Sequence, residues 1–269
     1  MRLSIRHVTH YRYSHPVRHT IQVLHLTPRS DPNQQVGRWR IEAPGRLSEF
    51  TDAYGNIAHM LTHDAVHEEL SIVVSGEAET ADTMGVLPAD GDVLPREVFL
   101  RPTALTAFEP AVRDFAEPLR GAVAADRLDG LHELSRAVAR AVAYRPGATG
   151  VDTTAAAALV AGTGVCQDQA HAFTAAARWL GVPTRYVSGY VHVAGDEGEA
   201  AASHAWSESW VEALGWVAFD VTNEICANDA HLRIAVGPDY LACAPVRGVR
   251  RGGGEEEMDV HVRVAALQQ

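Results

Sequence analysis

The spacing of hydrophobic residues changes its period along the chain, and this change divides the sequence into regions. Over the first hundred residues apolar side chains tend to recur at every second position, most clearly where Leu24 and Leu26 oppose Ile21 and Val23. Such alternation is typical of β-strands, whose successive side chains point to opposite faces. A turn signal at residues 52–56 separates two strand-like runs. We therefore predict several short strands in an antiparallel sheet or sandwich.

Helical spacing begins near residue 110, after a connector rich in Pro, Gly and Asp at residues 81–104. Leu131, Leu134 and Val138 recur at intervals of three and four residues, which is the pattern of an amphipathic helix. We expect Asp152 to cap a further short helix that follows it directly. The middle of the chain is therefore predicted to be helical.

A glycine-containing turn leads from that short helix into the next one, which we expect from about Val165 to Leu180. Gly162 and Gly164 end the first helix and place Cys166 at the start of the second. A thiol attacks as its thiolate, and the unpaired N–H groups and dipole of a helix start favour negative charge. The same N–H groups can hold an oxyanion. Cys166 is thus a candidate nucleophile, although a lone cysteine in this position is more often a small buried hydrophobe.

From residue 184 the period of two returns and predicts three further strands. A tight turn near Leu214 and Gly215 would bring the start of one strand beside the end of the next, and so His204 beside Asp220. An imidazole can activate a thiol and later protonate the leaving group, while a carboxylate orients the ring. Each residue alone has an ordinary structural explanation, but the hairpin favours a catalytic pair. Late strands are expected at residues 231–237 and 257–265.

Composition and charge narrow the class of protein. The chain has 269 residues, of which 46% are hydrophobic and 21% charged, as in an ordinary globular protein. Its net charge of −11, without a basic run, argues against nucleic acid or anionic membranes as partners. We expect no transmembrane segment and no secretory signal, and hence a cytoplasmic location.

The three cysteines give no disulfide framework and no zinc ribbon, since their number is odd and no C-x-x-C pair occurs. Cys226 and Cys243 are expected to be inert. The histidines of the β-rich region fit no tight metal motif. We therefore expect neither a metal nor a cofactor.

The motifs together resemble the bacterial transglutaminase-like family of cysteine enzymes. Its three core blocks are similar to GVCQDQAH at residues 164–171, SHAW at 203–206 and GWVAFDVTN at 215–223, in that order. The segments YRYSHPV, LTPR and DAYGN resemble the β-rich region that precedes this core, and HLRIAVGPDY resembles the family's later part. The resemblance covers nearly the whole chain.

This resemblance implies an α+β fold with two parts. Residues 1–100 would form the β-rich N-terminal domain, and residues 101–269 the papain-like or transglutaminase-like core with C-terminal strands, its cysteine helix packed on an antiparallel sheet. It also implies that Cys166 is the nucleophile, His204 the general base and acid, and Asp220 the orienting carboxylate. Gln169 stands where relatives often carry an aromatic residue, and Pro238 where they often carry Arg.

Several neighbouring residues have simpler expected roles. Asp168 should cap the cysteine helix, and His171 should be a packed or hydrogen-bonded residue. Gln167 and Thr163 are both open candidates for an oxyanion donor. The tryptophans of the late strands could line a groove but are more often core residues; they are Trp206, Trp210 and Trp216.

The function expected from these residues is acyl transfer through a thioester on Cys166, most simply the hydrolysis of a peptide or isopeptide-like amide. The partner would be a peptide or protein substrate. One alternative is a transamidase that joins glutamine to an amine, and another is a non-catalytic binding or scaffold module on the same fold. The sequence leaves the substrate and the oligomeric state open.

Overall fold

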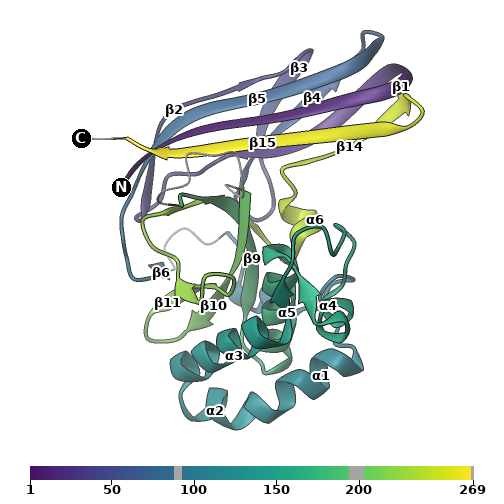
Figure 1. Cartoon of the computed structure of the whole chain (residues 1–269). Helices are drawn as coiled ribbons and strands as arrows, with labels where there is room; N and C mark the ends of the chain where they lie inside the picture. Colours follow the sequence, from purple (N-terminus) through teal and green to yellow (C-terminus); the bar gives the residue numbers. More distant parts are fainter. Residues whose placement is uncertain (88–92, 194–202, 268–269) are drawn as a thin grey trace.

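The computed structural model describes residues 1–87, 93–193 and 203–267. A large antiparallel sheet lies across one end of a core made of helices and a second sheet (Figure 1). Both chain termini lie at one end of the large sheet (Figure 1). The chain is therefore α+β, as predicted.

The large sheet has the order β2-β5-β1-β4-β3, and β14 and β15 also pair with β1. Its strands are β1 (Arg2–Thr27), β2 (Gln34–Glu42), β3 (Arg46–Thr51), β4 (Ile57–His63), β5 (His67–Thr80), β14 (Val246–Gly252) and β15 (Glu256–Ala266). The expectation of short strands was wrong for β1, which runs unbroken for 26 residues. Along its length β1 pairs with four partners, namely β5, β4, β15 and β14.

The last two strands return to the N-terminal sheet. Residues 256–266 of β15 pair with residues 3–13 of β1, and residues 246–252 of β14 pair with residues 17–24. The sequence placed both segments in the C-terminal part, 101–269, but predicted a strand only for β15; the division at residue 100 stays a prediction. The first sheet is thus built from both ends of the chain.

The second sheet has the order β12-β11-β10-β9-β13, with β6 paired to β11. Its strands are β6 (Val86–Leu87), β9 (Thr184–Val191), β10 (Ser203–Val211), β11 (Gly215–Asp220), β12 (Ile225–Cys226) and β13 (His231–Gly237). A small parallel pair joins β7 (Ala143–Tyr144) to β8 (Thr163–Gly164). Every described residue of β9, β11 and β13 is buried, because other elements cover both faces of this sheet.

Helices pack on the second sheet and on one another (Figure 1). They are η1 (Arg96–Leu100), α1 (Pro110–Ala116), η2 (Glu117–Leu119), α2 (Arg120–Ala125), α3 (Arg127–Ala141), α4 (Ala155–Ala161), α5 (Cys166–Trp179) and α6 (Tyr240–Cys243). Leu131, Leu134 and Val138 are all 0% exposed, which confirms the amphipathic pattern of α3. Thr154, and not Asp152, caps α4, because its side chain accepts from the N–H of Ala157.

A buried ionic network joins the two sheets. Arg185 donates to Glu208 at 2.6 Å, and Arg233 donates to the same carboxylate at 3.2 Å. Arg233 also pairs with Asp31, which lies between β1 and β2. The Gln34 side chain adds a 2.8 Å bond to the Arg233 carbonyl. These contacts fix the large sheet against the core, and therefore fix anything that lies between the two.

Candidate active site

Cys166 is the first residue of α5, where Asp168 fixes the helix start. Asp168 is 1% exposed, and its Oδ2 accepts the N–H of Val165 at 2.7 Å and the Thr149 hydroxyl at 2.6 Å. The carboxylate thereby satisfies an N–H that a helix start leaves without a partner. The predicted capping role of Asp168 is confirmed.

The two glycines before Cys166 act for different reasons. Gly162 ends α4 with φ +67°, a left-handed conformation that favours glycine. Gly164 has no such φ, but a Cβ built on it would lie 2.6 Å from the Cβ of Asp168. The close approach of Gly164 is therefore what lets Asp168 reach back to the turn that carries Cys166.

The hairpin of β10 and β11 brings His204 beside Asp220, as its turn predicted. Nε2 of His204 lies 2.8 Å from Oδ2 of Asp220, and the two residues are 7% and 0% exposed. His204 is the second residue of β10 and Asp220 is the last of β11, so the antiparallel pairing puts both at one end of the sheet.

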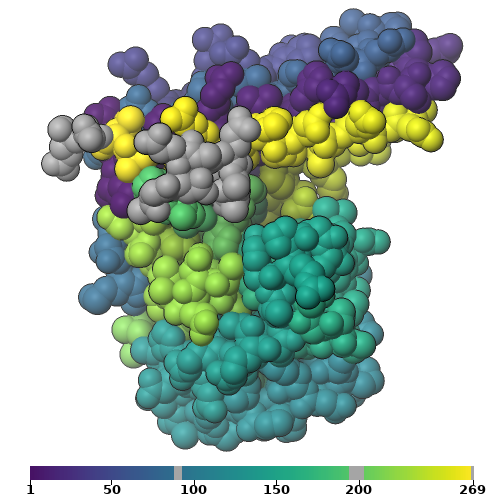
Figure 2. Space-filling view, viewed as in Figure 1, coloured from purple at the N-terminus to yellow at the C-terminus, as the bar shows by residue number. Residues whose placement is uncertain are grey.

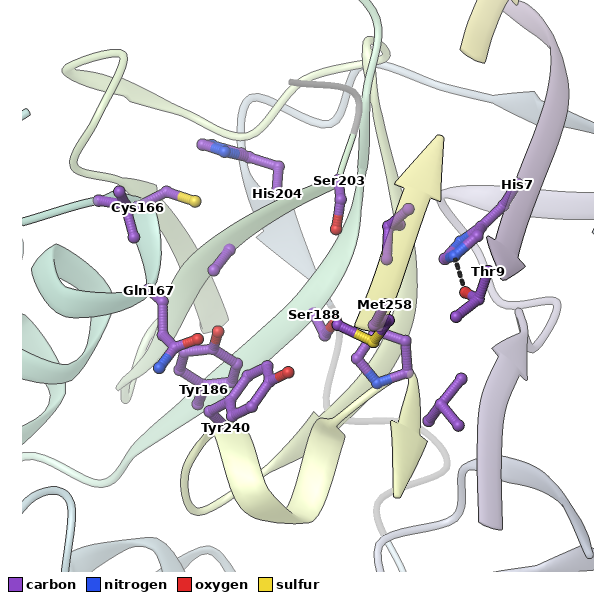
Figure 3. Close-up of a pocket in the computed structure, with 15 residues that line it drawn as sticks. His7, Thr9, Cys166, Gln167, Tyr186, Ser188, Ser203, His204, Tyr240 and Met258 are labelled. Atoms are coloured by element: carbon purple, nitrogen blue, oxygen red, sulfur yellow. Dashed lines mark hydrogen bonds between the residues drawn. The ribbon is translucent and has the colours of Figure 1, made fainter. Parts of the chain in front are cut away.

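His204 also faces Cys166, whose sulfur lies toward the imidazole side of the cavity (Figure 3). Burial opposes the charged imidazolium, but the hydrogen bond to Asp220 and the nearby Cys166 sulfur outweigh it and raise the pKa of His204 to about 10. Since Nε2 is bonded to Asp220, Nδ1 is the nitrogen left for the sulfur. The structure thus brings together the three residues that the sequence singled out.

Two residues that the sequence reasoning missed also hold Asp220. His231 Nε2 lies 2.9 Å from Oδ2, and the Asn223 side chain donates to the same oxygen at 2.6 Å. Burial alone would favour the neutral acid, but the bonds from His204 and His231 lower the pKa of Asp220. The one signal in the sequence was position: His231, like His204, stands at the start of a predicted strand.

The remaining predicted residues have structural roles. Nε2 of His171, 0% exposed, accepts the N–H of Tyr240, and burial lowers its pKa to about 4, so the ring is neutral and packed as expected. Gln169 donates to the Val142 carbonyl at 2.8 Å and accepts from the Thr222 hydroxyl. The three tryptophans are core residues, at most 8% exposed; they are Trp206, Trp210 and Trp216.

Neither of the two other cysteines is among the residues that line the cavity at Cys166, although Cys243 belongs to the buried cluster against which Cys166 packs. Burial raises the pKa of both the Cys226 and Cys243 thiols. Of the two candidates for an oxyanion donor, Gln167 lines the cavity beside Cys166, and Thr163 is not among the residues that line it. Pro238 contributes its carbonyl, which accepts from the guanidinium of Arg178 at 2.7 Å.

A cavity of about 260 Å³ opens in front of the sulfur and lies between the two sheets. Cys166 and His204 form one side, while His7 and Thr9 of β1 and Met258 of β15 form the other (Figure 3). Residues far apart in the sequence therefore line the same cavity, and the large sheet forms one side of it.

The described residues contain one group with the donor set of a metal site, formed by His204, Asp220 and His231. Both imidazoles already hydrogen-bond to the carboxylate, at 2.8 and 2.9 Å. This arrangement satisfies all three groups as a hydrogen-bonded network. We interpret the three residues as a hydrogen-bonded network that holds His204 in position, and not as a metal centre.

Comparison with known proteins gives the class. Residues 3–79 match the bacterial transglutaminase-like N-terminal region, and residues 113–221 match the transglutaminase-like superfamily. The protein belongs to this superfamily, and the predicted resemblance is confirmed.

Its relatives include an uncharacterized protein of Mycobacterium leprae, 32% identical over 99% of both chains. Another is an uncharacterized protein of Mycobacterium tuberculosis, 28% identical over 99% of this chain and 93% of the other. A solved structure from Cytophaga hutchinsonii, which bears the provisional name of cysteine protease, has the same fold with a TM-score of 0.75. It is 20% identical and covers 100% of this chain and 91% of its own.

Proposed function

We propose that the protein is a cysteine-dependent acyl-transfer enzyme that hydrolyses a peptide or isopeptide-like amide. Cys166 is the nucleophile, His204 the general base and acid, and Asp220 the carboxylate that orients the ring. The observation that carries the proposal is the buried His204, which is bonded to Asp220 at 2.8 Å and lines the same cavity as Cys166. Superfamily membership supports the same reaction class.

The proposed reaction has two halves that balance. The sulfur of Cys166 attacks the amide carbonyl, and N–H groups at the start of α5 stabilise the resulting oxyanion. The C–N bond then breaks, and His204 gives its proton to the leaving amine. Water next attacks the thioester while His204 accepts a proton from it. The C–S bond breaks, the carboxylic acid leaves, and the thiolate–imidazolium pair is restored.

Hydrolysis is the preferred outcome because transamidation needs an amine to compete with water for the thioester. Among the described residues that line the cavity at Cys166 there is no Asp or Glu that would bind a cationic amine. A peptide or protein amide is the proposed partner. A transamidase, and a binding module with an idle triad, are the competing functions.

The test is alkylation of the three cysteines by iodoacetamide at pH 6, followed by mass spectrometry of each site. A thiolate paired with an imidazolium reacts at this pH, whereas an ordinary thiol hardly does. We expect Cys166 to react at least tenfold faster than Cys226, which serves as the control within the same molecule. Equal rates, or an unchanged Cys166 rate in His204→Gln, would contradict the proposal.

Activity is then measured on a broad peptide library. Cys166→Ala should abolish amide cleavage, and retained cleavage would refute the assignment of the nucleophile. Incorporation of a labelled amine into protein in place of hydrolysis would favour the transamidase. Reactive Cys166 without turnover of any amide or amine would favour the binding module.

No helix in the described ranges is long and apolar enough to cross a bilayer. The cytoplasmic location remains an expectation from the sequence, as does the absence of nucleic acid and membrane partners. Fractionation of the natural host's cells checks the location.

A further inference from the structure

A second cavity, of about 350 Å³, adjoins the one in front of Cys166. Three residues line both cavities and form the passage between them: Tyr240, Val246 and Met258. Both cavities lie where the large sheet meets the core, and Figure 2 shows β15 in yellow extending over the helical part on this face.

The wall of the first cavity that faces Cys166 is largely apolar and held in place. Met258 and Val260 of β15 are 55% and 45% exposed, so a ligand would bury apolar surface there. Between the sheets, His7 bonds to the Tyr190 hydroxyl at 2.7 Å and to the Thr9 hydroxyl at 3.0 Å. These bonds satisfy the polar groups of this wall and fix it against the core. A bulky apolar side chain suits the space.

The second cavity is also lined mainly by apolar residues, but unlike the first it carries arginine and glutamate side chains. Its charged lining residues are Arg247, Arg250 and Glu256. Arg250 is already occupied, because it pairs with Glu256 at 2.9 Å and its guanidinium lies 5.1 Å from the ring centre of Tyr13. Arg247 donates one N–H to the Leu241 carbonyl at 3.0 Å, and no carboxylate of the described residues lies within ion-pair distance of it. The charge of Arg247 is thus held at the cavity and not neutralised.

Gln22 provides a second indication that this cavity takes a ligand. Its side chain lines the second cavity and is 7% exposed, and its amide oxygen has no hydrogen-bond partner among the described residues. A buried acceptor without a partner is unfavourable, and rotation of the amide toward the cavity would let an N–H donor of a peptide backbone satisfy it.

We propose that the two cavities form one substrate cleft for an extended acidic peptide. The first takes an apolar side chain next to the reacting carbonyl, and the second binds a carboxylate further along the peptide through Arg247. This assignment rests on the proposed function, since Cys166 marks the reacting end. The large sheet, through β1, β14 and β15, is then the part of the protein that selects the substrate.

The experiment uses peptidyl chloromethyl ketones, which form a C–S bond with Cys166 and release chloride. Each probe carries leucine next to the ketone, and Glu, Gln or Lys at one of the following three positions. We expect the Glu probe to react about fivefold faster than the Lys probe at one position, as for an exposed ion pair. The net charge of −11 would by itself favour the Lys probe, so it cannot produce this preference.

The charge reversal Arg247→Glu should invert the order of the Glu and Lys probes. Arg251→Glu is the matched control, because Arg251 is an exposed arginine on the same strand and is not among the residues that line either cavity. Added salt should reduce the preference in the wild type. Gln22→Met should slow all three probes equally, since it removes a backbone contact and no charge.

Iodoacetamide, which needs no peptide contact, separates the two proposals. Fast reaction of iodoacetamide with Cys166 but equal rates for Glu and Lys probes would overturn the cleft and leave the proposed function intact. A shift of the Glu-to-Lys preference in Arg251→Glu as large as that in Arg247→Glu would also overturn the cleft and leave the proposed function intact. If iodoacetamide itself reacts slowly with Cys166, the proposed function fails. The cleft is then tested by binding: the same peptides, made as carboxamides, should bind more tightly with Glu than with Lys, and equal affinities would overturn the cleft.

Discussion

Nε2 of His231 lies 2.9 Å from Oδ2 of Asp220, the oxygen that also holds His204. His231 begins β13, and β9 and β10 separate it in the sheet order from the strand of Asp220. It is 3% exposed, and its ring stands 5.3 Å from that of Trp206 at 83°. A second imidazole therefore holds the carboxylate from a strand that the hairpin does not contain.

His231→Gln tests this positioning role. Without the bond from His231, Asp220 should hold the imidazolium of His204 less well, and alkylation of Cys166 by iodoacetamide at pH 6 should slow by about tenfold. At pH 9 an ordinary thiol ionises without help, so the difference should disappear. His15→Gln is the control, at an exposed histidine whose imidazole hydrogen-bonds only to Ser14 among the described residues. A uniform loss at both pH values would indicate only a structural defect.

The stability of the fold should depend on pH through His204. Its folded-state pKa is raised above the ordinary value of 6.5 to about 10, so its contribution is full below pH 6.5 and declines as pH rises toward 10. Comparing Cys166→Ala with the double variant Cys166→Ala/His204→Gln removes the thiol, which would titrate in the same range. In urea unfolding at pH 6 to 8, the stability advantage of the protein with His204 should shrink with rising pH. A gap that widens would contradict the assignment.

Removing the carboxylate that joins the two arginines of the core should destabilise the protein strongly. Glu208 is 0% exposed, and the bonds from Arg185 and Arg233 keep its pKa low although burial acts in the opposite direction. Glu208→Leu removes the carboxylate that two buried guanidinium groups share, although Arg233 keeps its pair with Asp31, and should cost about 3–5 kcal/mol in the free energy of unfolding. Glu212→Leu breaks an exposed pair with Arg127 and should cost less than about 1 kcal/mol. Similar losses in both variants would contradict this reading.

Gly164→Ala should impair the site more than Gly162→Ala does. A Cβ at Gly164 would collide with Asp168 and displace the carboxylate from the N–H of Val165, so Cys166 alkylation at pH 6 should slow several-fold. At Gly162 a Cβ meets only the Ala141 carbonyl, at 3.7 Å, and the strain lies in the backbone. Gly162→Ala should therefore lower stability by about 1 kcal/mol while the alkylation rate holds. An equal loss of rate in both would show that the turn alone matters.

Much of the local structure follows from the sequence because it depends on neighbours along the chain. The spacing of Leu131, Leu134 and Val138 defines one buried face of a helix whatever that face packs against. Likewise a tight turn at Gly215 forces antiparallel pairing, and the pairing brings His204 toward Asp220. The cap of α4 was misplaced by two residues, from Thr154 to Asp152, since both can cap a helix and only the backbone conformation chooses.

Other features depend on which distant segments pack together, and no local pattern carries that information. The sequence alone determined the α+β class, the helix that carries Cys166 and the hairpin of His204 and Asp220. Tertiary structure decided that β1 is one long strand joined by β14 and β15, that His231 reaches Asp220, and that His7 and Met258 line the cavity at Cys166. The reason is physical: period and turns act over a few residues, whereas a cavity wall is made by strands that pair across more than two hundred residues.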